Sequence, residues 1–327
     1  MCNPLKTLFT VFMFYCFSIC LTFFNSRYIK VFPYPLSITL MHMIVKFLLS
    51  WSVRCFLSWF YDYPRIVLPW AKYVKTVAVS GVSSALDIGF SNWSFEFITV
   101  SLYTMTKSTS VVFIVMFSVL LKLEKKRPTL VIIVMLISCG LLMFSYESTQ
   151  FDYIGFLLVL AASFLSGIRW SFTQLIVQGQ CYGLSHPVDL MFHSQPWMVL
   201  AILPLSLYIE GFELITAKNL FRADAFNQLV GDLLQLCTGA LLAFGLELSE
   251  YLVVSSASSL TLSVASILKE VCTLYLASKF NGDSISHVNM IGFFICLCGI
   301  ALHIVVKAVN TCTWIFPKSI SSELQIR

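Results

Sequence analysis

The sequence predicts an all-α polytopic membrane protein, with ten transmembrane helices arranged as two inverted five-helix halves. The composition, the regular recurrence of apolar segments and two lysines within those segments support this prediction. Of the 327 residues, 58% are hydrophobic and 11% are charged, and the mean hydropathy is +0.85. Soluble domains carry about 25% charged residues. A soluble globular protein is therefore excluded.

The apolar segments recur along the whole chain at the length of about 17–25 residues that a helix needs to cross a bilayer. We expect spans near residues 7–24, 35–58, 75–95, 99–121, 128–146, 154–177, 188–209, 231–254, 256–278 and 287–309. The first could pass for a signal peptide, but no small-residue cleavage site follows it, and we interpret it as a retained helix. The chain is then a single membrane domain over residues 1–327, with halves at 7–146 and 154–309 and a cytosolic tail at 310–327.

Loop charges predict the orientation. With the N-terminus in the cytosol, twelve lysines and arginines are counted on the cytosolic side and five on the opposite side. Positive residues are retained on the cytosolic side, so both termini are expected there. The segment Glu210–Gln228 mixes charged with spaced apolar residues. It is expected to lie along the lumenal interface as a loop or short amphipathic helix.

Lys107 and Lys269 each lie well inside an expected span. A charge near the bilayer centre costs about 2.5–3.5 kcal/mol on insertion scales, unless it faces a wet cavity or a counter-charge. Neither lysine has an acid three or four residues away on its own helix. Each therefore needs a partner from another helix or an anionic ligand, which points to transport of an anion.

An internal echo links the two lysines. Asp87 precedes Lys107 by twenty residues and Glu250 precedes Lys269 by nineteen, five spans later. Two halves with an odd number of spans must be inverted in the membrane, and inverted repeats build a central site for alternating access.

Other charged residues within the spans leave two interpretations open. Arg169 follows the small residues Ser166 and Gly167, which leave room, and a guanidinium suits two-point contact with phosphate. Lys46 is explained by snorkelling toward a span end. The alternative is that the intramembrane acids and bases pair with one another and only fix helix packing; the acids concerned are Asp87, Asp232 and Glu247.

Other function classes lack support. The net charge of +5 is scattered and forms no nucleic-acid-binding stripe. The five histidines and eleven cysteines lack metal-ligand spacing, so no metal or other cofactor is expected. The chain carries no G-x-S-x-G, P-loop or G-x-G-x-x-G sequence. We expect that it is not an enzyme.

Two segments carry a family resemblance. SNWSFEFITVSLYTMTK, which runs from Ser91 to Lys107, and LTLSV, which precedes Lys269, resemble segments of the nucleotide-sugar and triose-phosphate translocators of solute carrier family 35. That family lies within the drug/metabolite transporter superfamily. The resemblance implies that the two lysines bind phosphate from opposite halves, with Ser91 and Asn92 near the site.

The position after the second lysine departs from part of the family. Triose-phosphate members carry an arginine there, whereas this chain has Glu270. An acid repels phosphate unless Lys269 or Arg169 neutralises it, which argues against triose phosphate or phosphoenolpyruvate as substrate. Further short sequence segments along the chain resemble subfamily C, which contains the Golgi GDP-fucose transporter. The expected substrate-binding residues are Lys107, Lys269, Ser91, Asn92, Arg169 and Glu270.

The resemblance implies an antiporter that carries a nucleotide sugar, with GDP-fucose as first candidate, into the lumen in exchange for a nucleoside monophosphate. The expected location is the Golgi or the ER–Golgi intermediate membrane. The expected partners are the anionic substrate and the lipid bilayer, without nucleic acid, and a homodimer is left open. Two alternatives remain: a non-transporting accessory protein that modulates glycosylation, and a transporter of another organic phosphate.

Overall fold

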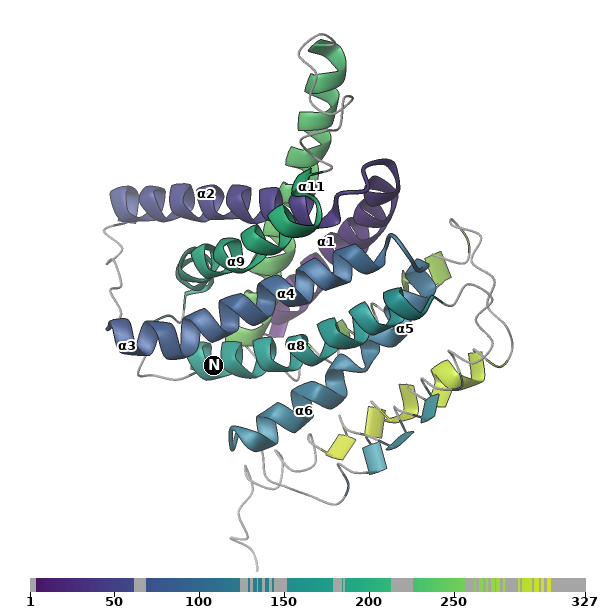
Figure 1. Ribbon diagram of the computed structural model, residues 1–327. Helices are drawn as coiled ribbons and strands as arrows, with labels where there is room; N and C mark the ends of the chain where they lie inside the picture. The colour runs from purple at the N-terminus through teal and green to yellow at the C-terminus, as the bar shows by residue number, and fades with distance from the viewer. Residues whose placement is uncertain are drawn as a thin grey trace, which may run out of the picture.

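The computed structural model describes residues 4–61, 69–123, 152–178, 184, 186–212 and 226–256, with individual positions between 129 and 143 and between 262 and 306. Within this part of the chain it is helical and contains no strand (Figure 1). The elements are α1 (Pro4–Val31), α2 (Pro35–Tyr61), α3 (Trp70–Lys72), the π-helix η1 (Tyr73–Ala78), α4 (Val79–Ser94), α5 (Val100–Ser108), α6 (Ser110–Leu120), α8 (Tyr153–Gln178), α9 (Pro187–Ile209) and α11 (Phe226–Ser256).

Six described helical segments are long and apolar enough to cross a membrane. They are Leu8–Val31, Pro35–Phe60, Val100–Leu120, Tyr153–Val177, Pro187–Ile209 and Val230–Ser255. Each coincides with an expected span. The expected span at 75–95 lies in the continuous helical run formed by α3, η1 and α4. The spans at 128–146, 256–278 and 287–309 fall in large part outside the described residues, so the number ten stays a prediction.

The first span is longer than predicted, because α1 continues to Val31 rather than ending near residue 24. Arg27 and Lys30 therefore lie on a helix and not in a loop. Asn25 and Ser26, which follow the predicted end, are polar but buried against the protein, at 5% and 2% exposure. Neighbouring helices pack around these two residues. Their polarity therefore does not mark the end of a membrane-spanning helix.

The expected short connection between the third and fourth spans is confirmed, since α4 ends at Ser94 and α5 begins at Val100. Thr99 caps α5 by accepting a hydrogen bond at its Oγ1 from the Leu102 amide, at 3.4 Å. The fourth span is broken at Thr109, between α5 and α6. Lys107 lies in the last turn before this break.

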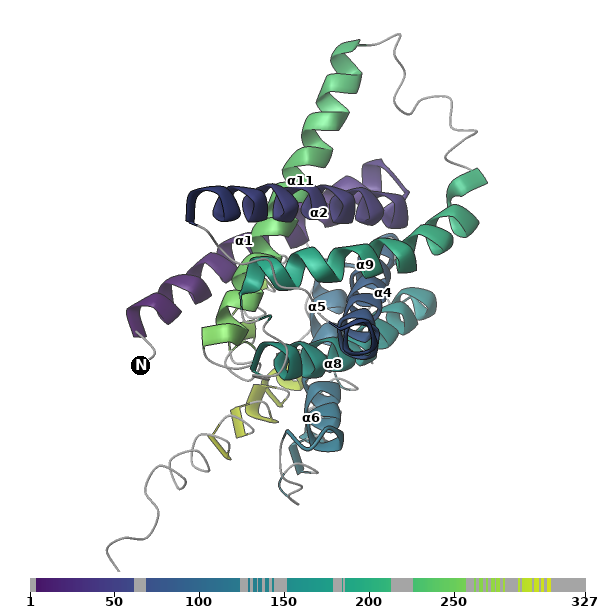
Figure 2. The ribbon, with the colours of Figure 1, turned by 90° about the vertical axis from the view of Figure 1, so that its left-hand side faces the viewer.

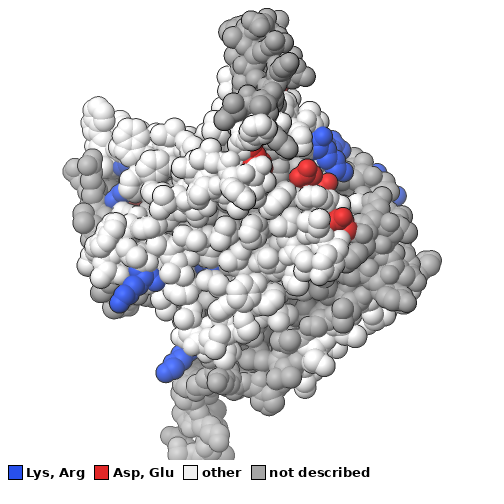
Figure 3. Space-filling model, viewed as in Figure 1, with Lys and Arg blue, Asp and Glu red and all other residues white. Residues whose placement is uncertain are grey.

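The helices pack around a shared interior. α4 contacts α8 and α9, α2 contacts α9, and α1 contacts α11 (Figures 1 and 2). The first turns of α11 extend beyond the other labelled helices in both views. Large apolar side chains such as Trp59 and Leu207 are exposed, and uncharged residues dominate the described surface in Figure 3. A surface of this kind suits contact with lipid.

Gly167 sets the distance between α6 and α8. A Cβ at this position would lie 2.7 Å from the backbone carbonyl carbon of Phe113. Small residues allow membrane helices to approach closely, and no side chain fits here without moving a helix. The glycine therefore serves helix packing, in addition to any room it leaves for Arg169.

Glu210, the first residue of the expected lumenal segment, is buried in the structure. It is 5% exposed at the end of α9, and its carboxylate accepts hydrogen bonds from the amides of Leu36 and Ser37, both at 2.7 Å. These amides belong to the first turn of α2, which lacks helical acceptors. Glu210 thus caps the first turn of a neighbouring helix. Residues 213–225 of the predicted segment lie outside the described part of the chain.

Substituting Lys122 by glycine is expected to stabilise the protein. Lys122 has a φ of 59° and closes α6 in a Schellman motif, with its amide on Val119 O at 3.1 Å and the Leu123 amide on Ser118 O at 2.8 Å. The left-handed conformation costs a residue with a Cβ about 1 kcal/mol. Lys122→Gly should raise the melting temperature in detergent by about 2 °C. Lys122→Ala, which keeps the Cβ, is the matched control and should produce no rise.

Candidate functional site

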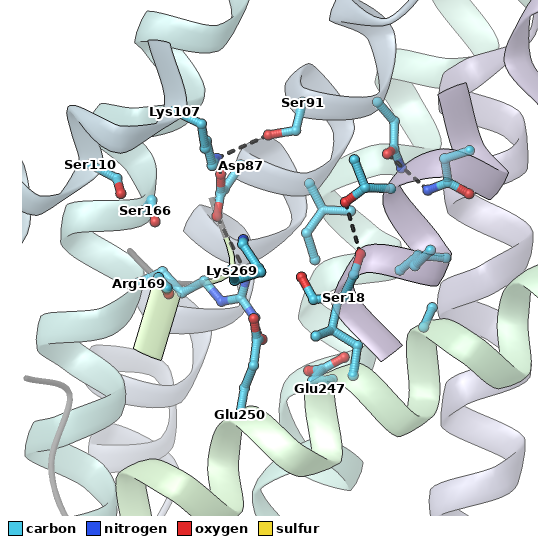
Figure 4. A pocket seen from close by; sticks show the side chains of 18 of the residues that line it. Ser18, Asp87, Ser91, Lys107, Ser110, Ser166, Arg169, Glu247, Glu250 and Lys269 are labelled. Carbon is cyan, nitrogen blue, oxygen red and sulfur yellow. Dashed lines mark hydrogen bonds and ion pairs between the residues drawn. The ribbon is translucent and has the colours of Figure 1, made fainter. Parts of the chain in front are cut away.

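A cavity of about 200 Å³ lies between the helices (Figure 4). Its wall is formed by side chains of α1, α2, α4, α5, α6, α8 and α11, together with residues between 262 and 273. The described charged residues that line it are Lys46, Asp87, Lys107, Arg169, Glu247, Glu250 and Lys269. Four bases therefore face three acids, which leaves one positive charge.

Five of the six expected substrate-binding residues line this one cavity: Lys107, Lys269, Ser91, Asn92 and Arg169. Glu270 lies outside the described residues. The tertiary structure thus brings together side chains from α4, α5, α8 and the segment around residue 269. That these side chains bind substrate stays a prediction.

Lys107 forms an ion pair with Asp87 of α4. Its ammonium also donates a hydrogen bond to Ser91 Oγ, at 2.9 Å. Asp87 and Ser91 are one helical turn apart, so one face of α4 holds the lysine from two positions. The partner that Lys107 was expected to need therefore comes from another helix.

Arg169 of α8 joins the two acids of the sequence echo. Its Nη1 lies 3.4 Å from Asp87 Oδ2, and its Nη2 donates to Glu250 Oε2 at 2.9 Å. The guanidinium also lies over the Trp170 ring, 4.6 Å from its centroid. Asp87 is thus shared between Lys107 and Arg169, and Glu250 pairs with Arg169 instead of with Lys269 (Figure 4). Of the two acid–lysine combinations in the sequence echo, Asp87 with Lys107 forms an ion pair, whereas Glu250 pairs with Arg169.

Lys269 differs from the other bases of the cavity. It forms no salt bridge with any residue that the structure describes. Its ammonium lies 5.8 Å from the centroid of the Phe14 ring, a distance at which a cation–π attraction is weak but favourable. Within the described part of the site, this lysine supplies the excess positive charge.

Lys46 and Glu247 form a buried ion pair between α2 and α11. The Lys46 Nζ and the Glu247 Oε2 are 2.5 Å apart, and the two side chains are 4% and 3% exposed. Glu247 also accepts hydrogen bonds from Gln195 Nε2 and Tyr251 Oη, both at 3.0 Å. The snorkelling expected for Lys46 is wrong, because its ammonium points to an acid of another helix. The Lys46–Glu247 pair therefore fits the alternative interpretation of the sequence, in which intramembrane acids and bases pair with one another and fix helix packing.

A chain of neutral polar groups forms another part of the wall. Asn92 donates to Thr39 Oγ1 at 2.8 Å and accepts from Asn25 Nδ2 at 3.1 Å. Sequence reasoning found Asn92 but missed Asn25 and Thr39, because uncharged polar residues are common at membrane helix contacts and give no local signal of a binding role.

An aromatic side chain, that of Tyr103, also reaches the site. Tyr103 lines the cavity, and its ring packs against Phe95 with centroids 4.4 Å apart. Trp93 is not among the described lining residues. The Tyr103 ring is therefore in position to stack against a ligand in the cavity.

Comparisons with known proteins decide the family. Residues 5–303 match the model of the Triose-phosphate Transporter family. The chain belongs to the Triose-phosphate Transporter family. Its members are transporters and not enzymes, so family membership identifies a polytopic membrane transporter of the drug/metabolite superfamily.

Two relatives of this family member carry different names. A probable sugar phosphate/phosphate translocator of Arabidopsis thaliana is 30% identical over 304 residues, covering 92% of this chain and 73% of the relative. A putative nucleotide-sugar transporter of Saccharomyces cerevisiae is 27% identical over 297 residues, covering 72% of this chain and 67% of the relative. A crystal structure aligns over 92% of this chain and 96% of its own, with a TM-score of 0.55 and 13% identity. That likeness supports the fold alone.

Proposed function

We propose that this Triose-phosphate Transporter family member is an antiporter that exchanges organic phosphate anions through the cavity lined by Lys107, Arg169 and Lys269. The observation that carries the proposal is Lys269, a cation without a salt bridge to a described residue, in one cavity with three further bases that are each paired with an acid. In a low-dielectric interior an uncompensated cation attracts an anion strongly. Phosphate suits such a site because lysine and arginine both bind it.

The carboxylate of Asp87 bridges Lys107 and Arg169 and so occupies the place that an anionic ligand would take. An entering phosphate competes with Asp87 for these bases and adds Lys269 as a third contact. The proposed cycle then moves the site between the two faces by rocking one five-helix half against the other, as inverted-repeat transporters do.

As the specific substrate we propose a nucleotide sugar, with GDP-fucose first, carried into the Golgi lumen in exchange for a nucleoside monophosphate. The resemblance to subfamily C and the relative named as a putative nucleotide-sugar transporter support this choice. Both termini would lie in the cytosol, in keeping with the excess of positive loops there. Protease protection of terminal tags in isolated Golgi vesicles tests that orientation.

A sugar phosphate is the second candidate, and the cavity size favours it. Ligand pockets are commonly about 300–1,000 Å³, whereas this cavity is about 200 Å³. The relative of Arabidopsis thaliana is named as a probable sugar phosphate/phosphate translocator. A nucleotide sugar would require the helices to separate further than a sugar phosphate would.

Counter-flow into proteoliposomes tests these proposals together. Proteoliposomes that contain the purified protein are preloaded with a nucleoside monophosphate or inorganic phosphate. A panel of labelled nucleotide sugars and sugar phosphates is then added outside. Saturable, preload-dependent uptake of one class identifies the substrate. Absence of exchange with every member of the panel would contradict the antiporter proposal and favour the non-transporting accessory role.

A further inference from the structure

We propose that Asn25 forms a second subsite in the cavity, which selects phosphate substrates whose neutral part carries a hydrogen-bond donor, O–H or N–H. This inference rests on the proposed function, because it concerns the same cavity. It adds a requirement that the charged residues alone do not impose, since Lys107, Arg169 and Lys269 address only the anionic group.

A directional chain of hydrogen bonds orients the Asn25 amide. Thr39 donates its hydroxyl proton to Pro35 O at 2.7 Å, so toward Asn92 it can only accept. Asn92 must therefore turn its NH₂ group to Thr39, which leaves its oxygen facing Asn25. Asn25 in turn must offer its NH₂ group to that oxygen, at 3.1 Å. The exchange of O and N in either amide would place two acceptors or two donors against each other.

The remaining atom of this chain is Asn25 Oδ1. Asn25 lines the cavity and is 5% exposed, and its Oδ1 is buried without a hydrogen-bond partner among the described residues. The hydroxyl one turn earlier on α1, that of Thr22, donates to Ser18 O at 2.8 Å and is thus committed elsewhere. A buried acceptor without a donor is unfavourable. A ligand that donates a hydrogen bond to Asn25 Oδ1 would relieve this cost.

The neutral subsite adjoins the anion site along α4. Ser91 accepts from Lys107, and the next residue, Asn92, holds Asn25. A substrate with a phosphate at Lys107 therefore directs its neutral part toward α1. Because Asn25 Oδ1 is shielded from solvent in this state, a small side-chain movement accompanies binding. Sugar phosphates and nucleotide sugars carry suitable O–H or N–H groups, whereas the carbon skeleton of phosphoenolpyruvate carries none.

The test compares ligands that differ by one donor. Binding of glucose 6-phosphate and GDP-fucose to the full-length protein in detergent is compared with that of their deoxyfluoro analogues, in which fluorine cannot donate a hydrogen bond. An N1-methylated guanine analogue of GDP-fucose tests the base N–H in the same way. For wild type, one analogue of the bound parent is expected to bind about tenfold more weakly, as for the loss of one buried hydrogen bond.

Variants assign that preference to the subsite. Asn25→Leu keeps the size of the side chain but cannot accept, so parent and analogue should bind it equally. Thr22→Val, on the same wall, should keep the tenfold preference because its hydroxyl is committed to Ser18. The comparison in wild type needs no variant and stands if Asn25→Leu does not fold.

The outcomes separate the two proposals. Equal binding of parent and every analogue by wild type, or a tenfold preference that persists in Asn25→Leu, would overturn the Asn25 subsite and leave phosphate exchange intact. No binding and no counter-flow of any phosphate ligand by wild type would overturn both. A preference that disappears only in Asn25→Leu supports the subsite.

Discussion

Lys269→Ala is expected to lower counter-flow of the organic phosphate about a hundredfold, with the protein folded and correctly located. Lys269 carries the excess positive charge of the described cavity wall and forms no salt bridge with a described residue. A hydrogen bond to a charged group is worth about 1.5–3 kcal/mol. Removal of the Lys269 ammonium should therefore weaken substrate binding and leave the stability of the fold unchanged. The initial rate of uptake into proteoliposomes measures the loss, and a melting curve in detergent shows that stability is kept.

Three comparisons sharpen this experiment. Lys269→Arg keeps the charge and should retain a measurable part of the uptake. Lys122→Ala removes an exposed lysine at the end of α6 that is not among the residues lining the cavity, and it should transport normally. Lys107→Ala should also abolish uptake, but it leaves Asp87 with Arg169 as its remaining base. Normal exchange by both Lys107→Ala and Lys269→Ala would show that the two lysines do not hold the phosphate.

Glu247→Gln is expected to destabilise the protein by about 3–5 kcal/mol, the cost of removing one member of a buried ion pair. The substitution leaves the Lys46 ammonium at 4% exposure without its acid, while glutamine keeps the shape and still bonds Gln195 and Tyr251. The loss is therefore electrostatic. Thermal unfolding in detergent should show a clear fall in melting temperature, together with reduced recovery of folded protein.

The matched control removes both charges. Lys46→Met combined with Glu247→Leu replaces the pair by apolar groups, which commonly restores or raises stability. A double variant close to wild type would confirm that the charge, and not the packing, was lost in Glu247→Gln. If Glu247→Gln melts like wild type, the two groups are not a buried ion pair in the folded protein.

The spans follow from the sequence because a helix in lipid must satisfy its own backbone groups within one segment. The apolar runs predicted at 154–177 and 188–209 are α8 and α9 to within one residue at each end. The predicted end of the first span, near residue 24, was too early, since α1 continues to Val31. Asn25 and Ser26 are polar, but the protein and not water surrounds them, and only residues distant in sequence, such as Asn92, can reveal this.

The identity of the site residues was accessible from sequence in part. An intramembrane charge is costly wherever it lies, so Lys107, Lys269 and Arg169 stand out without coordinates. Their membership of a single cavity, with Ser91 and Asn92, required the fold. Asn25 and Thr39 carry no charge, and uncharged polar residues are common at membrane helix contacts. Nothing local distinguishes them from packing residues.

The sequence by itself therefore determined that this chain is a membrane protein with spanning helices and intramembrane bases, because hydropathy and charge are properties of each segment. Only the tertiary structure decided which acid meets which base. Asp87 pairs with both Lys107 and Arg169, and Glu250 pairs with Arg169. Glu247 pairs with Lys46, which lies 201 residues away in the sequence. Ion pairing depends on distances of a few ångströms between helices remote in sequence. That geometry leaves Lys269 as the base available to an anion among the described residues.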